Sequence, residues 1–226
     1  MSTEEIALIN AEYLAVISLH GEVKELIIAC EKIEPNQNAN ISAIAELRST
    51  LDHIMRTHSV LYGIEDDQSI VEQTGMDAFH YCKSNLDKAL GHLYRAGYDA
   101  YDIMSISLSG KIRQLLTGRS KEALYHVIPD YLSILDQIEN AEKMIISAKV
   151  QKDVQGSEVE QKQFSEYSTA NTILDQILKK LELVMGRVIQ YEEEKEHKKK
   201  GEMRFHVILV IVILLLGMLI DHYIIK

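Results

Sequence analysis

Residues 205–220 read FHVILVIVILLLGMLI, and no other stretch of the chain is apolar for so long. Thirteen of these sixteen residues are Ile, Leu, Val or Phe, so a helix built from them has no polar face. A helix rises about 1.5 Å per residue, and one over residues 205–225 would span about 31 Å, close to the hydrocarbon thickness of a membrane. On insertion scales the apolar residues contribute about −4 to −8 kcal/mol in total. We predict a transmembrane helix over residues 205–225.

The residues that flank this run predict its orientation. Asp221 marks the far end, where Tyr223 and Lys226 suit a membrane interface. Four basic residues lie just before the run: Lys198, Lys199, Lys200 and Arg204. Because Lys and Arg stay on the cytoplasmic side, we expect a cytosolic N-terminal part held by a C-terminal tail anchor. The four basic residues are also placed to contact anionic lipid.

The rest of the composition predicts a helical domain. The chain has 226 residues with two prolines, no tryptophan and a net charge of −10. Without the anchor, about 200 residues remain, which is enough for one domain with a substantial core. The negative charge argues against a general nucleic-acid binder, so we expect no DNA partner.

The two cysteines, Cys30 and Cys82, do not indicate a metal site. They lie far apart in apolar helical patterns without CxxC spacing, so we expect reduced thiols in the core. His20 falls on an apolar stripe of the first helix, where we expect a hydrogen-bonded core side chain rather than a ligand. The chain has no Gly-rich phosphate loop, no GxSxG and no HExxH, and we expect no cofactor.

Apolar periodicity predicts an all-α fold. The expected helices cover residues 3–32, 41–59, 69–73, 77–116, 120–152 and a last stretch from residue 157 onward. Pro129 interrupts one of them, so we expect either a kink or a short helix followed by a longer one. The architecture we predict is an antiparallel bundle of about five long helices over residues 1–190. A charged helical stalk over residues 191–204 and the anchor over residues 205–225 follow it.

Two features predict how these helices pack. The helix at residues 41–59 carries an apolar stripe that we expect to face the core: Ile44, Leu47, Leu51, Ile54, His58 and Leu61. Gly91 and Gly97 each cost about 1 kcal/mol inside a helix relative to alanine. We expect both glycines to permit the close approach of a neighbouring helix.

An unusual group of polar residues lies within one sector of the helix at residues 77–116: His92, Arg95, Asp99 and Asp102. Arg95 and Asp99 are at ion-pair spacing. Two interpretations remain open. The group forms a polar pocket for a small anion or a metal ion, or it forms a salt-bridged helix face. A metal would need a further ligand from another helix.

Arg119 and His126, in the stretch RSKEALYH, form a second candidate pair. This arginine–histidine spacing within a helical bundle resembles the pattern of HEPN ribonucleases. The resemblance implies a metal-independent ribonuclease in which the pair, brought together across a dimer, cleaves RNA with the histidine as acid or base. Arg48 and His53 show a similar spacing.

The sequence therefore supports two hypotheses. The first is a non-enzymatic, tail-anchored scaffold or sensor/effector whose bundle binds a protein partner or itself at the cytosolic face of a membrane. Confinement by the anchor raises the effective concentration of the bundle and favours oligomers. The second is a membrane-tethered, HEPN-like nuclease, and RNA is a partner only in that case.

Overall fold

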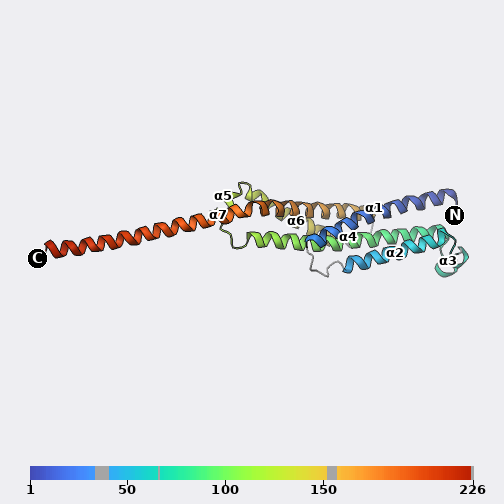
Figure 1. Ribbon diagram of the computed structural model, residues 1–226. Helices are drawn as coiled ribbons and strands as arrows, with labels where there is room; N and C mark the ends of the chain where they lie inside the picture. Colours follow the sequence, from blue (N-terminus) through green and yellow to red (C-terminus); the bar gives the residue numbers. More distant parts are fainter. Residues whose placement is uncertain (34–40, 66, 152–156, 225–226) are drawn as a thin grey trace. The chain divides into compact units, whose positions relative to one another are not determined.

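The computed structural model describes residues 1–33, 41–65, 67–151 and 157–224, and within them it contains helices and no strand (Figure 1). The helices in these residues are α1 (Thr3–Ile33), α2 (Ile41–Leu61), α3 (Asp67–Thr74), α4 (Ala78–Leu116), α5 (Lys121–Val127), α6 (Tyr131–Gln151) and α7 (Ser157–Ile224). The all-α fold is confirmed, and its five long helices are α1, α2, α4, α6 and α7. The stretches expected to separate helices near residues 35–40 and 153–156 lie outside the described residues.

The break between α5 and α6 has a local cause. Ser120 caps α5, because its hydroxyl accepts a hydrogen bond from the backbone N–H of Ala123 at 3.1 Å. Ile128 ends the helix with extended dihedrals, φ −117° and ψ 90°. It precedes Pro129, and the residue before a proline is driven out of the helical region by the proline ring. The second of the two expectations for Pro129 is therefore confirmed.

The helices form two compact units. The first contains Met1–Ile112 and Asp136–Leu178, and the second contains Arg113–Leu135 and Lys179–Lys226. Three helices, α4, α6 and α7, contribute residues to both units.

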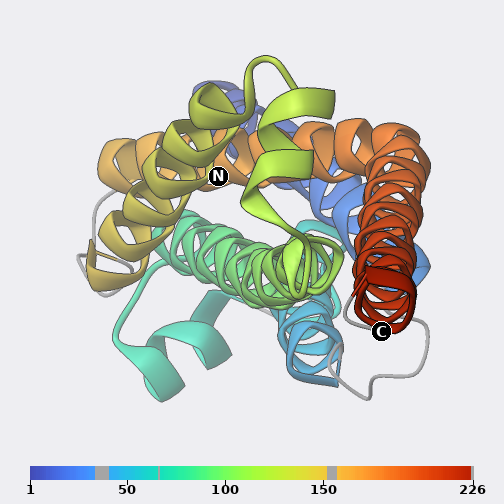
Figure 2. The ribbon, with the colours of Figure 1, turned by 90° about the vertical axis from the view of Figure 1, so that its left-hand side faces the viewer.

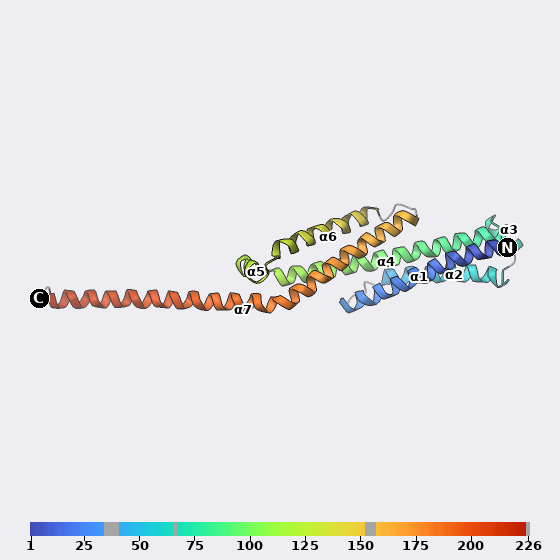
Figure 3. The same cartoon turned by 90° about the horizontal axis from the view of Figure 1, so that it is seen from above.

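In the first unit, consecutive long helices run in opposite directions. Ser42 of α2 bonds to Asp99 of α4, whereas His53 of α2 bonds to Asn85 of α4. A residue further along α2 therefore contacts a residue that comes earlier in α4, so these two helices are antiparallel. Figure 2 looks along the helices of this unit and shows α4 between α2 and α7. Figure 3 shows α6 and the first part of α7 running in opposite directions.

The predicted apolar stripe of α2 is divided: Leu47, Ile54, His58 and Leu61 are half-buried, whereas Ile44 and Leu51 are exposed. The prediction that the whole stripe faces the core is therefore wrong. Ile44 and Leu51 are 56% and 53% exposed, and Met55 on the same side is 52% exposed. The side turned toward the bundle carries small and polar residues instead: Ala43, Glu46, Thr50, His53, Thr57 and Val60. Small side chains allow the α2 backbone to approach α4 closely, and the polar ones find hydrogen-bond partners there.

The opposite side of α4 packs on α7 through a glycine. A Cβ placed on Gly97 would lie 2.3 Å from the ring of Phe164, so no larger residue fits there without movement. That ring packs edge-on against three tyrosines of α4, with centroids 5.2 to 5.7 Å away: Tyr94, Tyr98 and Tyr101. The prediction of close packing is confirmed for Gly97. It is wrong for Gly91, where the nearest neighbour of a Cβ would be Arg95 of the same helix at 3.5 Å.

Burial along α1 corrects one further expectation. His20 is exposed, so it is not a core histidine. The buried side of α1 is wholly apolar: Ile9, Val16, Leu19, Val23, Leu26, Ile27 and Cys30. Leu19 takes the inward position beside His20, because an uncharged aliphatic side chain loses no hydrogen bonds on burial.

In the second unit, α5 and the start of α6 pack on α7. The buried side of α7 in this unit consists of Leu181, Met185 and Val188. From residue 193 to residue 218 the described side chains of α7 are exposed. The helix continues through Gly201, so the expectation that residues 191–204 form a helical stalk is confirmed for the helix itself.

Candidate functional site

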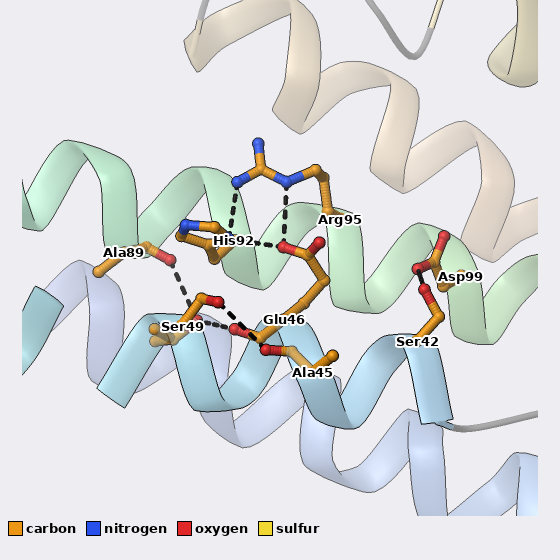
Figure 4. A network of polar contacts seen from close by, with 9 residues as sticks. Ser42, Ala45, Glu46, Ser49, Ala89, His92, Arg95 and Asp99 are labelled. Carbon is orange, nitrogen blue, oxygen red and sulfur yellow. Dashed lines mark hydrogen bonds and ion pairs between the residues drawn. The ribbon is translucent and has the colours of Figure 1, made fainter. Parts of the chain in front are cut away.

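The strongest concentration of polar contacts in the described residues joins α2 to α4. We call it the α2–α4 polar interface, and it consists of Ser42, Glu46 and His53 from α2 with Asn85, His92, Arg95 and Asp99 from α4. Figure 4 shows the part of it around Glu46, whose carboxylate projects from α2 toward α4.

Glu46 accepts from two side chains of α4. Nδ1 of His92 lies 2.6 Å from its Oε2 atom, and Nε of Arg95 donates to the same oxygen at 3.0 Å. Nη2 of Arg95 also lies 2.8 Å from Nδ1 of His92. Partial burial raises the pKa of Glu46, but the hydrogen bonds and positive charges of His92 and Arg95 outweigh it, so the pKa is below its ordinary value. The carboxylate is therefore ionised at neutral pH and holds both partners.

Further contacts extend the interface in both directions along α4. The hydroxyl of Ser42 donates to Asp99 at 2.5 Å. At the other end, Nδ1 of His53 lies 2.9 Å from Oδ1 of Asn85. The rings of His53 and His92 stack with centroids 5.3 Å apart. The interface thus extends over several turns of both helices and fixes their register.

Asp102 does not join this interface. It accepts from the hydroxyl of Tyr167 on α7 and pairs with Lys149 of α6 at 3.0 Å. Burial first, and then the hydrogen bond to Asp102, raise the pKa of Tyr167, so the phenol remains protonated and donates. The four polar residues expected to form one cluster on α4 are therefore divided between two separate contacts. His92, Arg95 and Asp99 face α2, whereas Asp102 faces α6 and α7.

Three participants were not singled out from the sequence, namely Ser42, Glu46 and Asn85, and His53 was noted only for its spacing from Arg48. A second stripe was available on α2, since Ser42, Glu46, His53 and Thr57 recur at helical spacing beside the apolar one. In the structure, Glu46 of α2 is the partner of both His92 and Arg95 of α4. Within the described ranges no group of three or more His, Cys, Asp or Glu residues is placed to hold a metal ion. Chemically, the interface is a network of hydrogen bonds around the ion pair of Glu46 with Arg95, and it joins two helices.

Arg119 and His126 lie in the second unit, each against α7. Nη1 of Arg119 donates to Glu192 at 3.0 Å, and the backbone N–H of Ser120 donates to the same carboxylate at 2.6 Å. The ring of His126 stacks on Tyr191, with centroids 4.4 Å apart. The bond from Ser120 and those from Arg119 outweigh burial and lower the pKa of Glu192. Both candidate residues thus help to attach α5 to α7.

The other arginine–histidine pair is divided between two sides of α2. Arg48 is exposed on the outer side, whereas His53 belongs to the α2–α4 polar interface. The contacts of His53, Arg119 and His126 join each of them to another helix of the same chain.

The basic residues expected to flank the membrane are exposed on α7: Lys198, Lys199, Lys200 and Arg204. Lys200 pairs with Glu196 at 2.6 Å, one turn away. In the described part of the chain, α7 is the helix long and apolar enough to cross a membrane, with a mean hydropathy of 2.0 in its most apolar window and none of that window buried. This fits a single transmembrane helix. Lys226 and the side chain of Tyr223 lie outside the part of the chain that the structure describes.

Comparison of the chain with protein-family models, with curated proteins and with solved structures found no match.

Proposed function

We propose that this protein is a membrane-anchored, non-enzymatic helical bundle that associates with a second copy of itself through the outer side of α2. The observation that carries the proposal is a row of exposed residues on α2, of which Ile44 and Leu51 belong to the stripe that sequence periodicity assigns to the core. We call it the α2 outer stripe, and it consists of Ile41, Ile44, Arg48, Leu51 and Met55.

The spacing of the stripe supports helix pairing. Its members follow one another at alternating steps of three and four residues, which is the spacing that lines the contact between two paired helices. Exposed apolar patches rimmed by charge are typical of protein interaction sites. Here the rim includes Asp52 and Arg56, which pair with each other at 2.8 Å.

Arg48 indicates which way the two copies would pair. In a parallel pair, Arg48 of one copy would meet Arg48 of the other, and two like charges would repel each other in the contact. In an antiparallel pair centred near residues 49 and 50, Arg48 lies opposite Leu51 of the second copy and beside its Asp52. Ile44 then meets Met55. The same surface is used by both copies, as in most two-fold dimers.

A membrane anchor supports this association. We propose that residues 205–225 hold the protein as a single-pass tail anchor with the bundle in the cytoplasm. The exposed apolar side chains of α7 and the four basic residues before them support this orientation. Confinement to a membrane surface raises the effective concentration of each copy, so a stripe of modest area is sufficient for pairing.

The experiment is the mass of the full-length protein in detergent, measured by light scattering. We expect a dimer that becomes a monomer in Leu51→Lys, because the new ammonium would lie against Arg48 of the second copy. Leu132→Lys is the matched control, since Leu132 is also exposed, at 61%. A monomeric wild type, or loss of the dimer in Leu132→Lys alone, would contradict the proposal. Capture of an unrelated protein in place of a second copy would contradict self-association.

Cysteine cross-linking tests the direction of pairing. Mixed copies carrying Ile44→Cys and Met55→Cys should cross-link to each other, whereas copies carrying Met55→Cys alone should not. Cross-linking of Met55→Cys with itself would indicate the parallel arrangement instead. RNA cleavage by the full-length protein that disappears in His126→Ala would overturn the non-enzymatic part of the proposal.

A further inference from the structure

The basic residues that precede the apolar run of α7 differ in the partners that the structure gives them. Lys200 pairs with Glu196 at 2.6 Å, and its hydrogen bond and charge lower the pKa of Glu196, so the carboxylate is ionised and balances the ammonium. Lys195 pairs with Glu122 of α5. The positive charges of these two lysines are therefore balanced by acidic residues of the same chain.

Three other basic side chains of this segment are exposed and form no ion pair with a residue that the structure describes. We call them the α7 basic cluster, and it consists of Lys198, Lys199 and Arg204. Glu202 lies within the same stretch, and the cluster outnumbers it three to one. The segment next to the apolar run thus carries a net positive charge, whereas the whole chain carries a net charge of −10.

The height of the cluster along α7 matches the headgroup layer of a membrane. A helix rises about 1.5 Å per residue, so the cluster lies about 1.5 to 10.5 Å from Phe205, where the apolar run begins. The headgroup layer is about 5 to 8 Å thick on each side of the hydrocarbon core. Arg204 falls within this layer, and the long stems of Lys198 and Lys199 let their ammonium groups reach it.

The directions of the three side chains favour lipid over a protein partner. The helix is continuous through residues 198–204, and successive residues of a helix point about 100° apart. Lys198, Lys199 and Arg204 therefore project about 100° to 140° from one another around the helix axis. A protein partner would contact one side of α7, whereas lipids surround a transmembrane helix on all sides.

The charge of the cluster selects the class of lipid. A guanidinium forms paired hydrogen bonds with a phosphate group, and an ammonium attracts the phosphate as a point charge. Zwitterionic lipids carry a phosphate whose charge is cancelled by their own ammonium group. Lipids with a net negative charge gain the full attraction, which is about fivefold for each basic residue near the membrane surface.

We propose that the α7 basic cluster enriches anionic phospholipids around the anchor, so that lipids of net negative charge replace zwitterionic ones beside Lys198, Lys199 and Arg204. The enrichment rests on the proposed function, because the transmembrane anchor holds the cluster at the membrane surface. The attraction is electrostatic, so added salt weakens it.

The test uses tryptophan fluorescence, because the chain contains no tryptophan of its own. Met203→Trp introduces one beside Arg204, at a position that is 60% exposed and where tryptophan suits a membrane interface. The full-length variant is reconstituted in vesicles of phosphatidylserine and phosphatidylcholine in equal amounts, with one or the other lipid brominated near its headgroup. Bromine quenches tryptophan at short range, so the two preparations report which lipids lie beside α7. We expect phosphatidylserine to be enriched at least about twofold at low salt, and less at about 0.5 M sodium chloride.

Removal of the cluster should remove the enrichment. The variant Lys198→Gln with Lys199→Gln and Arg204→Gln, in the Met203→Trp background, should be quenched equally by the two brominated lipids. The matched control removes three exposed positive charges from α1 and α4: Lys24→Gln, Lys88→Gln and Arg113→Gln. That control changes the net charge by the same amount and should keep the enrichment, because the cluster is intact.

The two brominated lipids also separate failure of the enrichment from failure of the anchor. Equal quenching by both lipids in the Met203→Trp protein would overturn the enrichment and leave the anchor in place. An enrichment that persists without the cluster, or that is lost equally in the control, would overturn the role of the three residues. Quenching by neither lipid would overturn the anchor itself, and the enrichment with it.

Discussion

The two sides of α4 hold the first unit together by different means. Toward α2, the contact consists of the paired charges around Glu46, and the α2 residues buried there are small or polar. Toward α7, it consists of Gly97 and a ring of tyrosines closed around Phe164. The comparison shows that the orientation of a helix depends on the specific contacts of its side chains with neighbouring helices, and not on its apolar stripe alone.

The α4–α7 side should be the more sensitive to added volume. Gly97→Ala should destabilise the full-length protein in detergent by about 1 to 3 kcal/mol, because the methyl group would overlap the Phe164 ring, which three tyrosines hold in place. Gly91→Ala is the matched substitution in the same helix, where a Cβ meets ordinary contact distance. It should stabilise by up to about 1 kcal/mol, since alanine is the better helix former. Thermal unfolding measures both, and changes of the same sign would contradict the difference in packing.

The α2–α4 side should respond to pH. The folded-state pKa of Glu46 lies below its ordinary value of 4.5, so the contribution of the carboxylate is complete above that value and is lost as the pH falls through the folded pKa. Glu46→Gln should lower stability by about 1 kcal/mol at pH 7, because charge-assisted hydrogen bonds become neutral ones. The difference from wild type should shrink below pH 4.5, and urea titrations at both pH values measure it. Glu139→Gln, which breaks an exposed pair with Lys143, should have a smaller effect. A difference that does not change with pH would show that Glu46 does not act through its charge.

Much of the fold follows from the sequence, because its signals are local. The proline after Ile128 ends α5 whatever surrounds it, and the ends of the long helices follow from apolar periodicity and from glycines such as Gly118, whose φ is +78°. Periodicity groups the apolar residues of α2 on one stripe, but it does not predict that Ile44 and Leu51 are exposed. The orientation of α2 depends on Glu46 meeting His92 and Arg95, which lie about fifty residues further along the chain.

The candidate site divides in the same way. His92, Arg95 and Asp99 lie in one sector of α4, and all three contact α2. Asp102 belongs to a different contact, because it pairs with Tyr167 and Lys149 on two other helices. Spacing within one helix predicts which residues lie near one another along that helix. It carries no information about which of two neighbouring helices each residue will meet.

The two buried cysteines allow the sides to be compared in one experiment without changing the net charge. Cys82 lies beside the carbonyl of Thr57 on α2, and Cys30 of α1 donates to the carbonyl of Ala100 at 3.0 Å. Burial raises the pKa of Cys30 to about 11. Both cysteines are buried, so each should react with a maleimide only when the structure opens. Because little apolar surface of α2 is buried, we expect α2 to separate more readily than the rest of the unit, and Cys82 to be modified faster than Cys30.

Gly97→Ala sharpens this measurement. An opening that releases only α2 leaves the strain between residue 97 and Phe164 in place, so the rate at Cys82 should not change. Cys30 lies on α1, and Val23 of the same helix packs with Phe164 against Gly97, so we expect exposure of Cys30 to require loss of this packing as well. Its rate should then rise by the factor that corresponds to the measured loss of stability. Mass spectrometry of labelled peptides over time gives both rates, with the protein unfolded in denaturant as the control for intrinsic reactivity. Equal rates at the two cysteines, or equal acceleration of both by Gly97→Ala, would mean that the two sides of α4 open as one cooperative unit.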